Sequence, residues 1–162
     1  MVLKRFRFTA ITFLVAFLIF GCSEGGKPSS NRGAAPDFEL TSFENTKIKL
    51  SDFQDKTAVL LAFWATWCPP CVEEIPLLNQ IHEKYSKNNQ LHVLSVNVGE
   101  DRQKIESFKK DHPINYPILL DLNENVSQRY EISGLPVIVI VAKNGEILYY
   151  GFTVPNLEGL VK

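Results

Sequence analysis

Two cysteines separated by two prolines, Cys68-Pro69-Pro70-Cys71, have the residue types and spacing for chemistry. Proline fits the first turn of a helix, because the N–H that it lacks would be unpaired there in any case. Cys68 is therefore expected at a helix N-cap, where unpaired backbone N–H groups and the helix dipole favour its thiolate. Cys71, one turn further along, is placed to attack a mixed disulfide formed at Cys68.

The same cysteine spacing also occurs in sites that hold zinc or iron, or that attach haem. Zinc would need two further ligands, and the three histidines, His82, His92 and His112, are scattered and unpaired in the sequence. Haem attachment needs a histidine directly after the second cysteine, where this chain has Val72. We therefore expect no metal and no cofactor, and dithiol–disulfide exchange becomes the favoured chemistry.

The elements that must position the cysteines follow an α/β order. Residues 58–64 form an unbroken apolar run, typical of a strand buried on both faces, and residues 69–87 show helical spacing of apolar side chains. We expect the other elements to be a hairpin at 37–50, a strand at 91–98, a helix at 101–110, a strand at 117–120, a helix at 123–131 capped by Asn123, strands at 136–142 and 147–152, and a short last helix capped by Asn156. This order predicts a central mixed sheet flanked by helices, with the cysteines at the carboxyl end of a strand.

The first residues differ in character from the rest of the chain. Three basic residues within the first seven precede an apolar run at residues 9–20, which ends at Gly21-Cys22. This pattern is typical of a signal peptide, and residues 1–21 resemble a bacterial lipoprotein signal that is cut before a cysteine that becomes lipid-modified. A non-lipid signal peptide and an uncleaved anchor are the alternatives. All three place the rest of the chain outside the cytoplasm, on the oxidising side of a membrane.

The remaining composition describes one tethered domain. Residues 22–36 are rich in Gly, Ser and Pro, so we expect a flexible tether that leads from Cys22 to a domain at residues 37–162. The whole chain is 45% hydrophobic and 22% charged, with a net charge of -1. Such a charge gives no sign of a nucleic-acid surface. We expect a monomer held by lipidated Cys22 on the extracytoplasmic face of a bacterial membrane.

The chain resembles the thioredoxin superfamily over about residues 36–160. The resemblance is carried by the segment from Phe63 to Cys71, by Pro76 five residues after the second cysteine, and by Gly134-Leu135-Pro136 before an apolar strand. It implies a thioredoxin-like fold in which Pro136 is a cis-proline that faces the cysteines. It also implies that Leu135 and Trp67 line the substrate groove, although Trp67 could equally be a packing aromatic.

A narrower resemblance is to the membrane-anchored TlpA/ResA-like thiol–disulfide oxidoreductases. It is carried by the N-terminal hairpin, the segment Trp67 to Pro76, the inserted helix and strand at residues 101–120, and the anchoring signal. In that group an acidic residue three positions after the second cysteine lies near the site, and Glu74 matches it. Cytoplasmic thioredoxins carry a buried aspartate where this chain has Ala62. The resemblance therefore implies that Glu74 is the proton carrier, against the alternative of a solvated first-turn acid.

This resemblance implies a function outside the cytoplasm. The chain would reduce disulfides in partner proteins, for example apocytochrome c during cytochrome c maturation, and a membrane electron donor would re-reduce it. A disulfide-forming oxidase of the same fold is the first alternative, because the two prolines between the cysteines do not fix the direction of exchange. A redox-inert module that binds haem, a metal or a protein is the alternative from another class.

Overall fold

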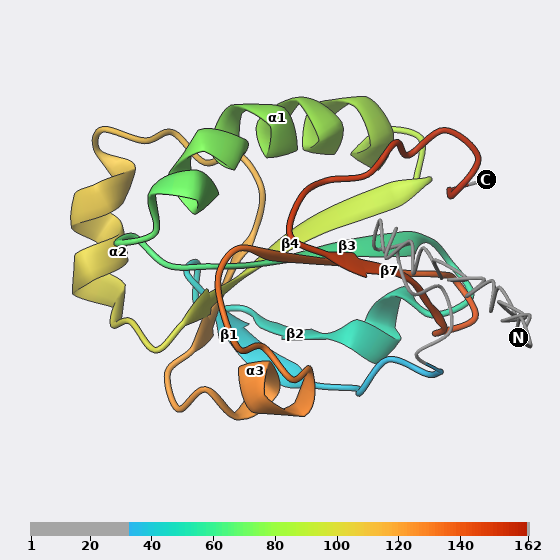
Figure 1. The fold of residues 1–162 in the computed structure, drawn as a ribbon, viewed down its shortest axis with the longest axis horizontal. Coiled ribbons are helices and arrows are strands. Elements are labelled where there is room, and N and C mark those ends of the chain that lie inside the picture. Colours follow the sequence, from blue (N-terminus) through green and yellow to red (C-terminus); the bar gives the residue numbers. More distant parts are fainter. Residues whose placement is uncertain (1–32, 162) are drawn as a thin grey trace, which may run out of the picture.

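The computed structural model describes residues 33–161. Within these residues one seven-stranded mixed sheet has the strand order β2-β1-β5-β4-β3-β6-β7 (Figure 1). The elements are β1 (Glu39–Ser42), β2 (Lys47–Lys49), the 3-10 helix η1 (Leu50–Phe53), β3 (Ala58–Trp64), α1 (Pro69–Ser86), β4 (Leu91–Val98), α2 (Arg102–Lys109), β5 (Ile118–Asp121), α3 (Asn125–Arg129), β6 (Val137–Val141) and β7 (Ile147–Gly151). β3, β4 and β5 run parallel, and the other pairs are antiparallel.

The sheet separates two hydrophobic cores. α1 and α2 cover one face, whereas α3 and η1 lie on the other (Figure 1). Every residue of β3 is buried, since its side chains alternate between the two cores. Leu60, Ala62 and Trp64 face α1, and Val59, Leu61 and Phe63 face α3. This two-sided burial explains why β3 is apolar throughout rather than alternating.

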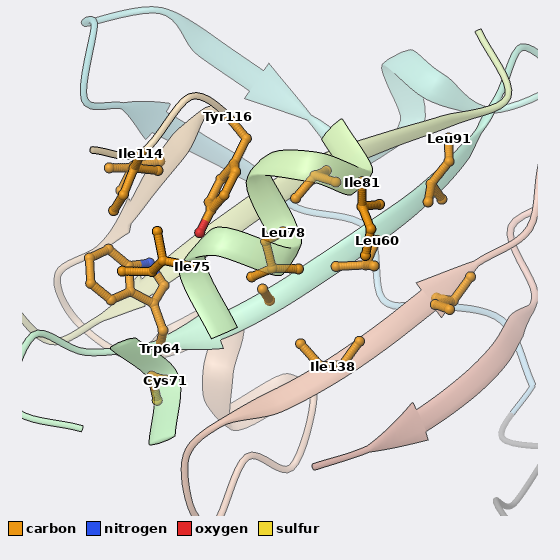
Figure 2. Packing of buried hydrophobic residues seen from close by; sticks show 14 of the residues in the cluster. Leu60, Trp64, Cys71, Ile75, Leu78, Ile81, Leu91, Ile114, Tyr116 and Ile138 are labelled. Atoms are coloured by element: carbon orange, nitrogen blue, oxygen red, sulfur yellow. The ribbon is translucent and has the colours of Figure 1, made fainter. Parts of the chain in front are cut away.

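Helix α1 begins as its sequence predicts. Cys68 is the N-cap, the two prolines occupy the first turn, and Pro76 lies inside the helix. Its buried face consists of Cys71, Ile75, Leu78 and Ile81, which pack over the central strands (Figure 2). The helical spacing of these apolar side chains is what fixes α1 against the sheet.

Two local predictions are wrong. Asn123 does not cap the helix after β5, because the carboxylate of Asp121 accepts the N–H groups of Val126 (3.2 Å) and Ser127 (2.8 Å) in its place. Near the end of the described residues, Asn156 accepts the N–H of Glu158 at 2.9 Å, but only turns follow it and no helix forms. Asn side chains close local turns as readily as they cap helices, so the pattern alone could not separate the two.

The described end of the expected tether packs on the domain. Ala34 forms an isolated antiparallel bridge with Glu146, and the hydroxyl of Tyr130 donates to the carbonyl of Pro36 at 2.8 Å. Residues 33–36, the end of the expected tether, therefore contact the domain. The expected signal peptide and lipidation at Cys22 lie outside the described residues. Between residues 33 and 161, no helix is both long and apolar enough to cross a membrane.

Candidate active site

Cys68 and Cys71 form a disulfide at the point where β3 gives way to α1. Their Cα atoms lie 5.3 Å apart, and the two residues are only 2% and 3% exposed. The N–H of Cys71 donates to Cys68 Sγ at 3.3 Å, so a backbone donor of the first helical turn points at this sulfur. When the disulfide is reduced, the same donor would stabilise negative charge on Cys68.

The loop that precedes β6 lies beside the disulfide. The Leu135–Pro136 peptide bond is cis, and Pro136 lines a small interior cavity together with Cys71. Phe63 of β3 pairs with Val137 of β6, so the loop reaches the carboxyl end of β3, where the cysteines follow. Leu135 is half-buried and contacts both hydrophobic cores. The structure thus brings the three residues of the predicted exchange site, Cys68, Cys71 and Pro136, together.

Two exposed aromatic side chains lie at this end of the molecule. Trp67 directly precedes Cys68 and is 64% exposed, which favours a substrate-facing position over packing. Phe152 is 65% exposed and follows Gly151, which pairs with Ile138 near Pro136. Phe152 belongs to no motif in the sequence, because only the register of β6 and β7 places it at the site.

Glu74 approaches the disulfide from the interior side. It lines the same small cavity as Cys71, and the cavity wall also includes Ala62, whose methyl group leaves room for it. Burial raises the pKa of the Glu74 carboxyl, while a hydrogen bond with the backbone of Val154 acts in the opposite direction. A carboxyl group with a raised pKa is better matched to a thiol in proton transfer.

Glu100 is a site residue that the sequence analysis missed. It is 5% exposed, and its carboxylate accepts the N–H and hydroxyl of Thr66, both at 2.7 Å, in the loop between β3 and α1. Asn97 donates to it at 2.9 Å, and Lys104 Nζ lies 2.6 Å away. Burial raises the pKa of Glu100, but these partners outweigh burial and hold the pKa below its ordinary value. Glu100 therefore anchors the loop that carries Cys68.

This anchor left little trace in the sequence. Glu100 lies 34 residues from Thr66 and belongs to no recognisable motif. The only local signal is that Lys104 follows Glu100 at helical (i, i+4) spacing. Residues 33–161 contain no group of three or more His, Cys, Asp or Glu side chains that could hold a metal ion.

A helix N-cap disulfide with a cis-proline beside it, on a mixed sheet covered by helices, defines a thioredoxin-like protein. The profile of the AhpC/TSA family matches residues 32–150, and the chain belongs to this family. Two relatives carry the name thiol-disulfide oxidoreductase ResA. That of Geobacillus kaustophilus is 38% identical over 113 residues, 70% of this chain and 64% of the relative. That of Bacillus subtilis is 33% identical over 135 residues, 83% of this chain and 74% of the relative.

The solved structures agree with the fold. A thiol-disulfide oxidoreductase of Bacteroides fragilis has a TM-score of 0.69 and 27% identity, and the match covers 78% of this chain and 96% of that one. StoA of Bacillus subtilis, at 24% identity and a TM-score of 0.65, shares the fold over 78% of this chain and 94% of its own. The predicted thioredoxin-like fold and the resemblance to ResA are thus confirmed. The chain spans just under two thirds of the Geobacillus relative, at 64%.

Proposed function

We propose that the protein is a thiol–disulfide oxidoreductase that reduces disulfides in partner proteins through Cys68 and Cys71. The observation that carries this proposal is the disulfide at the N-cap of α1, where the Cys71 N–H points at Cys68 Sγ. The names of the ResA relatives support the same chemistry.

The exchange proceeds in two steps. The Cys68 thiolate attacks one sulfur of a partner disulfide, and the bonding electron pair leaves with the other sulfur as a thiolate, which takes a proton. Cys71 then loses its proton and attacks Cys68 Sγ, and the partner's second sulfur leaves with the electron pair of the mixed disulfide. The partner gains two electrons and two protons, and the Cys68–Cys71 disulfide remains.

Glu74 receives the proton of Cys71 in the second step. The proposal is supported by the cavity that the two residues share and by the raised pKa of the Glu74 carboxyl. Ala62, at the wall of the same cavity, has no group that could take this proton. Glu74 is therefore the general base for resolution and the general acid when the disulfide is reduced again.

The partner chain binds across Trp67, Leu135 and Pro136. Trp67 offers an exposed aromatic surface beside Cys68, and the loop before β6 offers backbone groups next to the disulfide. An extended segment of the partner would pair with this backbone and place its disulfide against Cys68.

The proposed place of action is the extracytoplasmic face of a bacterial membrane, with Cys22 as the lipid anchor and residues 1–21 as the signal. The basic and apolar pattern of the first residues supports this place. A membrane protein would supply electrons to the oxidised site, and a substrate such as apocytochrome c would receive them. The protein would act as a monomer.

The opposite direction, disulfide formation, is the competing function. The helix N-cap favours the Cys68 thiolate, and a stabilised thiolate makes a disulfide more oxidising. The equilibrium reduction potential of Cys68–Cys71 against glutathione separates the two. A reductase has a potential well below the value of about −120 mV that is typical of the strongest periplasmic oxidant, DsbA. A potential near that value would contradict the proposed direction.

A further inference from the structure

A small, partly enclosed cavity lies behind the disulfide, between α1 and the sheet. Its volume is about 10 Å³, and residues from β3, α1, β4, β6 and the segment before β5 line it. A space of this size holds about one water molecule when polar groups surround it. Its polar lining consists of Cys71, Glu74, Trp64, Ser95 and Tyr116.

Two of these groups, the Trp64 indole N–H and the Tyr116 hydroxyl, are polar donors of buried residues and have no role in the exchange steps described above. Trp64 and Tyr116 are each 5% exposed, and the Trp64 indole N–H has no hydrogen-bond partner among residues 33–161. Figure 2 shows the indole nitrogen of Trp64 and the oxygen of Tyr116 beside Ile75 of α1. A buried N–H without a partner destabilises the folded protein, and a bound water would offset this cost.

Glu74 and Tyr116 also interact electrostatically, because the charge of Glu74 affects the pKa of the Tyr116 phenol. Burial raises the pKa of the Tyr116 phenol, and the negative charge of Glu74 raises it further. Tyr116 is therefore neutral at physiological pH and keeps a proton that it can donate toward a carboxylate. A neutral donor beside Glu74 favours the ionised form of that carboxyl group.

We propose that the Tyr116 hydroxyl and the Trp64 indole N–H hold one water in this cavity, and that this water carries the proton between Cys71 and Glu74. Tyr116 is thereby a positioning residue, since it acts through the water and through Glu74. This proposal rests on the function proposed for Glu74 and adds the path by which the proton reaches it.

The proton path balances at each step. When Cys71 attacks Cys68 Sγ, its S–H proton passes to the water, and the water releases one of its own protons to the Glu74 carboxylate. The electron pair of the thiolate forms the Cys68–Cys71 bond, and the pair of the mixed disulfide leaves with the partner sulfur. Reduction of the disulfide by an external dithiol reverses each transfer.

Tyr116→Phe tests the inference with little change of shape. The reduced protein is mixed with Ellman's disulfide, which releases one coloured thiolate when Cys68 attacks it and a second when Cys71 resolves the adduct. Loss of the hydroxyl destabilises the Glu74 carboxylate, so the pH midpoint of the second release is expected to rise by about one pH unit. The first release should not change.

Tyr130→Phe is the matched control. Tyr130 is equally buried at 3% exposure, but it lies in the core on the other face of the sheet, where its hydroxyl donates to Pro36. Its loss should lower stability and leave both releases at their original pH midpoints. An equal rise of the midpoint in Tyr130→Phe would overturn the assignment to Tyr116.

A double-mutant cycle with Glu74→Gln locates the effect. In the Glu74→Gln background, Tyr116→Phe should cause no further shift. If Tyr116→Phe leaves the pH midpoint of the second release unchanged in the wild-type background, or shifts it equally in both backgrounds, the inference about Tyr116 is overturned. The function proposed for Glu74 would still stand. If Glu74→Gln itself leaves the second release unchanged at every pH, the function proposed for Glu74 fails.

A second replacement covers the case in which Tyr116→Phe fails to fold. 3-Fluorotyrosine at position 116 keeps the ring and the hydroxyl but makes the phenol a stronger acid and a better donor. The midpoint of the second release is then expected to move to lower pH, opposite to the shift in Tyr116→Phe. An unchanged or higher midpoint with this residue would contradict the proposal.

Discussion

At the scale of the residue, the two cysteines differ in what surrounds them. Cys68 Sγ accepts a backbone N–H at the start of α1, whereas Cys71 lies one turn deeper against the interior cavity. The first environment stabilises a thiolate, and the second requires a base before the sulfur can react. This asymmetry supports the proposal that Cys68 attacks the partner disulfide and that Cys71 resolves the mixed disulfide.

We predict that Cys68 of the reduced protein reacts with iodoacetamide at a pH at which an ordinary cysteine is still protonated. The N–H groups of the first helical turn favour its thiolate, so alkylation should begin below the usual thiol range of about pH 8.5. Mass spectrometry of the protein after short exposure across a pH series identifies the modified residue. Cys68→Ser should remove the early reaction, and its persistence there would assign the reactive thiol to another residue.

At the scale of the element, the loop between β3 and α1 is held in place by a residue from another part of the chain, Glu100. Glu100, just beyond the end of β4, binds both the N–H and the hydroxyl of Thr66, and Lys104 of α2 pairs with it. Three elements thus meet at one buried carboxylate. The position of Cys68 depends on this contact as well as on the helix that Cys68 caps.

We predict that Glu100→Gln lowers the free energy of unfolding by about 1–3 kcal/mol at neutral pH, because the amide cannot accept from all the donors that surround it. The pKa of Glu100 is lower in the folded protein than its ordinary value of 4.5. Its stabilisation is therefore present above that ordinary value and is lost as the pH falls through the lowered pKa. Urea unfolding should thus show a smaller difference from the wild type in acid.

Glu106→Gln is the control for this measurement, because Glu106 is an exposed carboxyl on the same helix as Lys104. It should change the unfolding free energy by less than about 0.5 kcal/mol. A Glu100→Gln protein as stable as the control at neutral pH would show that the Thr66 anchor contributes little.

At the scale of the whole molecule, we propose that one domain is anchored to a membrane through its N-terminal segment. The disulfide lies at the carboxyl end of the central strand β3. Residues 33–35 pair with the turn between β6 and β7 and with the start of β7, so the chain enters the domain at the β7 edge of the sheet. The proposed tether to the membrane would therefore span residues 22–32 rather than 22–36.

We predict that Cys22→Ser releases the protein from the membrane fraction and leaves the reduction potential of Cys68–Cys71 unchanged. The lipid would be attached to Cys22, outside the domain that carries Cys68 and Cys71. Cell fractionation and metabolic labelling with a radioactive fatty acid measure the two halves of this prediction. Continued membrane association of the unlabelled variant would indicate an uncleaved anchor instead.

The sequence allowed the fold to be predicted wherever local pattern and tertiary packing agree. The apolar run of β3 and the cysteines with their two prolines marked the strand, the helix start and the disulfide. Glu100 and Tyr116 could not be found, because their partners are distant in the sequence and only the packed sheet brings them together. The last helix was predicted wrongly because the Asn156 pattern fits a turn equally well.

The most direct test of the central claim is to trap a partner with Cys71→Ser in living cells. Without Cys71 the mixed disulfide at Cys68 cannot be resolved, so we predict covalent complexes that disappear when a reductant is added. Non-reducing electrophoresis and mass spectrometry would detect these complexes and identify the partner cysteines. The Cys68→Ser, Cys71→Ser double variant should form none. Absence of any complex with Cys71→Ser, or the same complexes with the double variant, would contradict the account.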